Sequence, residues 1–125
     1  MIDARAMHNK VKMTTVSQLA NQPGFILLNK KKQPDRAVTS VYCCDLLSDV
    51  IVKAPAGSAW VTVMGNVNAV AACSIAGAAC MVVAGGADVD SAALEKAETH
   101  GVLILKSGAP VYETARSIDD MLKMF

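Results

Sequence analysis

The stretch over residues 58–86, SAWVTVMGNVNAVAACSIAGAACMVVAGG, constrains the fold of this chain more than any other. A β-rich run over residues 59–64 meets Gly65, and small apolar residues follow at helical density over residues 66–78. A second β-rich run, residues 80–83, ends at a pair of glycines. Strand, glycine turn, helix and strand make a βαβ unit, and such units close right-handed into a parallel sheet.

The rest of the chain continues the alternation of strands and helices, and several of the strands are continuously apolar. This pattern is typical of a largely parallel sheet that is covered on both faces. The expected elements are a helix over 14–20, strands over 25–28 and 36–43, a helix over 46–54, a helix that begins within 88–91 and ends at Gly101, a strand over 102–105, and a last helix from Pro110. We therefore expect a three-layer α/β/α sandwich with about five strands.

Local signals place the ends of these helices. Thr14 and Asp45 are natural N-caps for the helices that follow them, and Asp90 or Ser91 caps the helix that ends at Gly101. Pro110 fits the first position of the last helix. We expect residues 13–125 to form one domain, with residues 1–12 as a mobile lead-in.

Composition limits the class of protein. Hydrophobic residues make up 53% of the 125 residues and charged residues 18%, which excludes disorder for most of the chain. So high an apolar share in a small protein predicts a homo-oligomer, most commonly a homodimer. The net charge of +1 and the aromatic share of 4% give no case for nucleic-acid binding. The one dense basic run, residues 30–32, is interpreted as a solvated turn.

We expect a cytoplasmic protein, because no apolar run is long enough to span a membrane and the N-terminus has no signal-peptide core. The four cysteines form no CxxC pair, and they are interpreted as small buried hydrophobes in a reducing compartment. Cys43 and Cys44 are adjacent, so their side chains should point to opposite faces of a strand. No metal or other cofactor is expected, since the only histidines are His8 and His100.

Enzyme signatures are absent from the sequence. It contains no Walker-type phosphate loop, no GxGxxG and no GxSxG. His100 precedes a strand, so it should lie at the end of the sheet opposite the candidate site, and Asp119 and Asp120 are interpreted as a solvated helix face. The sequence shows no recognisable catalytic set of a nucleophile, a general base and a residue that orients the base.

Ligands of such sheets bind beyond the carboxyl ends of the strands, where the connecting loops converge. The candidate ligand-binding residues in these loops are Asp45, Gly65, Asn66, Asn68, Gly85, Gly86 and Ser107. Because helix N-termini favour anions, they predict a small anionic or nucleotide-like ligand. Each residue also has a purely structural interpretation: Asp45 and Asn66 as helix caps, and the glycines as left-handed turn residues.

Several segments resemble the DRTGG domain family in its stand-alone form. Residues 41–50, VYCCDLLSDV, are similar to its G-Y-x-x-D-L-L-S-D-V segment. Residues 60–63 and 68–71 resemble its W-V-T-x and N-x-V-A motifs. Residues 84–86 stand in the place of its T-G-G, and residues 34–36 look like its D-R. The resemblance runs from about Met13 to Leu122.

The resemblance implies a fold like the N-terminal domain of HPr kinase/phosphorylase, in a family whose members act as regulatory modules beside CBS domains or accompany hydrogenase- and ferredoxin-linked genes. The kinase activity associated with such names belongs to a P-loop domain that this sequence lacks. Two departures stand out: Ala84 replaces the threonine of the family, and Cys43-Cys44 replaces small residues such as glycine.

The sequence therefore predicts a non-catalytic regulatory or ligand-sensing domain that acts as a homodimer and binds a small ligand or a partner enzyme. The alternative is a protein-interaction module that docks on a metabolic or redox enzyme without a small ligand. A third hypothesis is an enzyme such as a phosphotransferase accessory, but the sequence contains no P-loop for such an activity.

Overall fold

The computed structural model describes residues 14–29 and 34–124. The expected lead-in over residues 1–12, with His8, and the basic run over residues 30–32 lie outside these described residues.

A five-stranded sheet forms the centre of the molecule, with the strand order β1-β5-β4-β3-β2. The strands are β1 (Phe25–Leu27), β2 (Ser40–Cys43), β3 (Ser58–Thr62), β4 (Cys80–Val83) and β5 (Ile104–Ser107). Strands β2 to β5 are mutually parallel, whereas β1 pairs antiparallel with β5. The prediction of a largely parallel sheet is confirmed, and β1 is the strand that departs from it.

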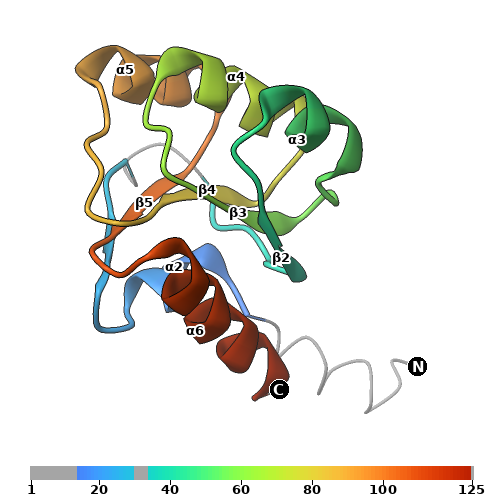
Figure 1. The fold of residues 1–125 in the computed structure, drawn as a ribbon, viewed down its shortest axis with the longest axis vertical. Helices are drawn as coiled ribbons and strands as arrows, with labels where there is room; N and C mark the ends of the chain where they lie inside the picture. Colours follow the sequence, from blue (N-terminus) through green and yellow to red (C-terminus); the bar gives the residue numbers. More distant parts are fainter. Residues whose placement is uncertain (1–13, 30–33, 125) are drawn as a thin grey trace.

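Helices cover both faces of this sheet, so the three-layer architecture is confirmed. Helices α3, α4 and α5 lie together on one face, and α2 and α6 lie on the other (Figure 1). Their bounds are α2 (Val16–Ala20), α3 (Leu47–Lys53), α4 (Val67–Ala76), α5 (Ser91–His100) and α6 (Val111–Lys123). None of the described helices has both the length and the apolar character that a membrane-spanning helix needs.

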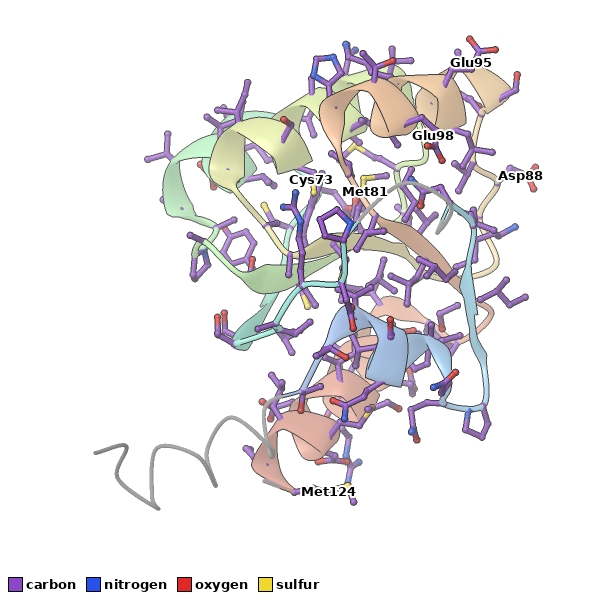
Figure 2. All side chains as sticks on the ribbon, turned by 180° about the vertical axis from the view of Figure 1, so that it is seen from behind. Cys73, Met81, Asp88, Glu95, Glu98 and Met124 are labelled. Atoms are coloured by element: carbon purple, nitrogen blue, oxygen red, sulfur yellow. The ribbon has the colours of Figure 1, made fainter. Side chains whose placement is uncertain are left out.

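Alternate side chains of the central strands fill two separate cores. Trp60 and Met81 point to the core beneath α3, α4 and α5, and Figure 2 shows Met81 beside Cys73 between that layer and the sheet. Val61 and Val82 point to the core beneath α2 and α6. All residues of β3 and β4 are buried, because both faces of these central strands are covered.

The strand expected over 102–105 lies two residues later, at Ile104–Ser107. Three other expected boundaries are wrong for a local reason. The N-cap of α2 is Thr15, whose side chain accepts from the backbone of Gln18 in a capping box, and not Thr14. The strand expected over 36–43 begins only at Ser40, because residues before it pair elsewhere: Ala37 forms an antiparallel bridge with Thr15. Pro110 occupies the N-cap position of α6 and not its first helical position.

Residues 34–39, which lead into β2, lie at the amino ends of the parallel strands. The Arg36 guanidinium donates to the carbonyl of Gly101 at 3.1 Å, just before β5, and the Thr39 amide donates to the carbonyl of Gly57 at 2.9 Å, just before β3. His100 also lies at this end, as its position before a strand predicts. The opposite, carboxyl edge of the sheet is formed by the loops that carry the candidate residues.

Asn29, shortly after β1, bonds to the backbone at the start of β5 and gives a stability prediction. Its side-chain nitrogen donates to the carbonyl of Val102, its oxygen accepts from the amide of Ile104 at 2.7 Å, and the residue is buried. Asn29→Ala should lower the free energy of unfolding by about 2 kcal/mol, because both backbone groups lose their partner in a buried place. Urea denaturation followed by circular dichroism measures this change. An unchanged midpoint would show that water replaces the amide at no cost.

The cysteines divide into two pairs, which corrects the expectation that all four are buried. Cys73 and Cys80 are buried, and burial raises the pKa of the Cys73 thiol to about 12. Cys43 is exposed and Cys44 half-buried, because Cys43 ends the edge strand β2 and Cys44 follows it. Cys44 packs against the core beneath α3, whereas Cys43 lines a groove beside α6, so the two side chains do point to opposite faces.

Candidate functional site

The four loops that follow the parallel strands are joined to one another at the carboxyl edge. The amide of Gly85, after β4, donates to the carbonyl of Ala109 at 2.7 Å, and the amide of Gly86 donates to that of Ser107 at 3.0 Å. The amide of Asp90 donates to the carbonyl of Gly65 at 2.8 Å, which joins the loop after β3 to the start of α5. The convergence expected from the sequence is therefore present in the fold.

Asp45 ties the loop after β2 to the end of β3. Its Oδ1 accepts from the Thr62 hydroxyl at 2.6 Å and from the Val63 amide at 3.1 Å. The expected N-cap role is wrong: Leu46 occupies that position of α3, without a side-chain cap. Asp45 is exposed, and within the described chain its Oδ2 has no hydrogen-bond partner, so this oxygen is free to accept from a ligand.

A hydrogen bond from the buried Trp60 side chain fixes the turn that carries Asp45. The Trp60 indole N–H donates to the carbonyl of Cys44 at 2.8 Å, and the side chain itself is completely buried. On the other side of the turn, the Leu46 amide donates to the Cys44 sulfur at 3.4 Å. A core side chain thus fixes the backbone immediately before the candidate carboxylate.

The loop after β3 contributes Gly65, Asn66 and Asn68. Asn66 caps α4, since its Oδ1 accepts from the Ala69 amide at 2.9 Å, which confirms its structural interpretation. Asn68 is exposed in the first turn of α4, where backbone N–H groups are unpaired. Gly65 does not have left-handed backbone, so its interpretation as a left-handed turn residue is wrong. It is buried, and glycine is required because a Cβ there would lie 2.2 Å from the Asp88 carbonyl oxygen.

Gly85 and Gly86 both adopt left-handed backbone, with φ of 70° and 68°. Two consecutive residues in this region demand glycine, as the structural interpretation of the pair required. Both are exposed, and a Cβ at Gly86 would meet nothing within 4 Å. The outer side of this loop is therefore accessible, although the amides of both glycines donate within the fold.

Ser107 differs from the other candidates because its hydroxyl already has partners within the fold. Its Oγ lies 2.8 Å from the hydroxyl of Thr114 and accepts from the Ala109 amide at 3.2 Å. The Thr114 hydroxyl in turn donates to the carbonyl of Ala109. Sequence reasoning missed Thr62 and Thr114, although a hydroxyl residue in an otherwise apolar strand is a signal for Thr62.

The charges at this edge are mainly acidic. Asp45, Asp88 and Asp90 are all exposed, and Figure 2 shows Asp88 projecting outward from its loop. Among the described residues, no three His, Cys, Asp or Glu side chains gather in a metal-binding arrangement. The edge therefore offers carboxylate acceptors.

Two hollows of the described chain lie on the face of the sheet that carries α2 and α6. One, of about 310 Å³, lies between β2 and α6, and the other, of about 400 Å³, lies between α2 and β1. The candidate residues line neither of them. The first hollow contains Cys43 and was not predicted from the sequence.

Comparisons with protein-family models and with curated protein sequences find no match. Among solved structures, the chain is similar to the CBS and DRTGG domains of the regulatory region of Clostridium perfringens pyrophosphatase, complexed with the activator diadenosine tetraphosphate. The TM-score is 0.72 at 11% sequence identity, over 98% of this chain and 52% of the other. The chain thus spans about half the length of that structure and shares its α/β fold.

Proposed function

We propose that this chain is a DRTGG-type regulatory domain without catalytic activity, which senses a small nucleotide-like ligand at the carboxyl edge of its sheet. The observation that supports this proposal is the likeness of fold to a regulatory region complexed with a dinucleotide activator. At such low identity the likeness concerns the fold, so the site itself is argued from this chain's own residues.

The groups at the carboxyl edge favour a nucleoside with an attached phosphate over a free anion. The free Oδ2 of Asp45 is an acceptor for a ribose hydroxyl or a base amino group. The N-terminal amides of α4, beside Asn68, favour a phosphate. The carboxylates of Asp88 and Asp90 repel any phosphate group, because like charges repel at short range, so contacts to the ribose and the base have to supply the affinity that an isolated phosphate lacks.

Titration calorimetry with diadenosine tetraphosphate, ATP, adenosine and inorganic phosphate tests the proposal. We expect the nucleotides to bind the wild-type chain, and inorganic phosphate not to bind. Asp45→Ala and Asn68→Ala should each weaken nucleotide binding about tenfold or more, the effect of one lost charge-assisted or ligand hydrogen bond. The site is refuted if no adenine nucleotide binds, or if both variants keep the wild-type affinity.

Two further variants separate ligand contact from local structure. Asp45→Asn retains an oxygen that accepts from Thr62 and Val63 but loses the charge, so it should fold normally and still bind more weakly. Glu95→Ala removes an exposed carboxylate on the outer face of α5 (Figure 2), away from the candidate loops, and should leave the affinity unchanged.

The alternative is an interaction module that docks on a metabolic or redox enzyme. It is favoured by exposed apolar side chains on the layer formed by α3, α4 and α5. Val52 of α3 is 80% exposed, and Ile75 of α4 is 67% exposed. This function requires a stoichiometric complex with one identified enzyme, which Val52→Glu or Ile75→Glu disrupts. Nucleotide binding by the isolated chain that Asp45→Ala abolishes would decide for the sensing domain.

A further inference from the structure

The β2 edge of the sheet is open in the described chain and has an exposed aromatic residue beside it. Strand β2 pairs with β3 on one side only, so backbone groups on its outer side are unpaired. Edge strands of this kind pair readily with another strand. Tyr112, at the start of α6, is 69% exposed and lines the groove between α6 and β2.

One stripe of α6 faces this groove and consists of exposed or half-exposed residues. Tyr112, Arg116, Asp119 and Lys123 follow one another at spacings of four, three and four residues, which places them on one side of a helix. Tyr112, Arg116 and Asp119 line the groove, together with Val41 and Cys43 of β2. Asp119 pairs with Lys123 of its own helix at 2.8 Å. Among the described residues, the Arg116 guanidinium has no ion-pair partner.

The order of charges along this stripe is self-complementary under a two-fold axis. If two copies of α6 lie antiparallel with the axis beside Ser117 and Ile118, Arg116 opposes the partner's Asp119. The same axis places Tyr112 against the partner's Lys123, a favourable aromatic–cation pair. A closed dimer requires such a surface, in which one patch matches itself.

We propose that this edge, made of β2 and the Tyr112–Lys123 stripe of α6, is the interface with a second copy of the chain. The two β2 strands lie antiparallel at the two-fold axis, and each groove receives the partner's stripe. Tyr112 supplies apolar contact area, and the Arg116–Asp119 pairs set the orientation of the two copies. This inference is independent of the ligand site proposed above, which lies on loops at the carboxyl edge.

Charge reversal and charge exchange test the interface by sedimentation equilibrium over a concentration series, without ligand. Arg116→Glu and Asp119→Arg should each raise the Kd of the wild-type dimer about tenfold or more, because each places like charges opposite one another. The double variant, Arg116→Glu with Asp119→Arg, restores opposite charges across the axis and should return the Kd to near the wild-type value.

The matched control is Glu95→Arg, a charge reversal of an exposed residue on α5, which should leave the dimer unchanged. Thermal unfolding shows that each variant is folded. A monomer at every concentration, a dimer that neither single variant weakens, or a double variant as weak as the singles would overturn the proposal. Because the readout is the oligomeric state without ligand, these outcomes leave the ligand site to its own test.

Discussion

Gly65→Ala is expected to destabilise the domain by about 3 kcal/mol or more, a cost typical of severe overpacking against groups that cannot move. A Cβ at Gly65 would lie 2.2 Å from the Asp88 carbonyl oxygen and 2.8 Å from the Val89 Cα. Both neighbours are backbone atoms, so no side-chain rotation relieves the clash. The backbone of the loop before α5 has to move, which also breaks the bond from the Asp90 amide to the Gly65 carbonyl.

Urea denaturation followed by circular dichroism measures the effect of this substitution. Gly108→Ala is the matched control, because a Cβ at Gly108 would meet nothing within 4 Å and its backbone is not left-handed. The control should change stability by no more than about 0.5 kcal/mol. Equal stabilities of the two variants would show that the loops at the carboxyl edge are loosely packed.

Much of the fold was predictable because the signals are local or periodic. The apolar runs and the glycine turn of the central unit correctly predicted β3, α4 and β4, with β3 and β4 as parallel neighbours. Asn66 caps α4 as its position predicts, since the cap bonds to an amide three residues away. The position of Gly101 at the end of α5, with φ of 72°, followed from the same kind of signal.

The sequence was misleading where a polar side chain bonds to a distant segment. Asp45 has the residue type and position of an N-cap. Its carboxylate instead accepts hydrogen bonds from Thr62 and Val63, at the end of the neighbouring strand β3. Asn29 was not singled out from the sequence, and its partners, Val102 and Ile104, lie 73 and 75 residues away along the chain. A single sequence contains no local signal for such pairs.

For the candidate site, the sequence predicted which loops converge but not how each residue is used. The glycines and Asp45 lie together because carboxyl ends of parallel strands share one edge. Ser107 was one of the candidates, and in the structure its hydroxyl bonds to Thr114 and accepts from the Ala109 amide, just before α6. Thr114 lies on the buried side of α6, and a periodic pattern marks such a position as core without revealing its partner.

Substitution of Trp60 is expected to have the second large effect on stability. Two substitutions separate its role in core packing from its role in positioning the turn that carries Asp45. Trp60→Ala should lower the free energy of unfolding by about 3–5 kcal/mol, because it removes the largest fully buried side chain and leaves a cavity in the core. Trp60→Phe keeps most of the ring volume and loses the bond to the Cys44 carbonyl, at a cost of about 1–2 kcal/mol.

The two substitutions also differ in their expected effect on the candidate site. Trp60→Phe should remain folded and bind nucleotide more weakly than wild type, because the turn that presents Asp45 is no longer held at Cys44. Denaturation followed by circular dichroism gives the stabilities, since Trp60 is the only tryptophan and its fluorescence is lost in both variants. Calorimetry of Trp60→Phe gives the affinity. A folded Trp60→Phe variant with the wild-type affinity would mean that the bonds from Thr62 and Val63 are sufficient to position the carboxylate.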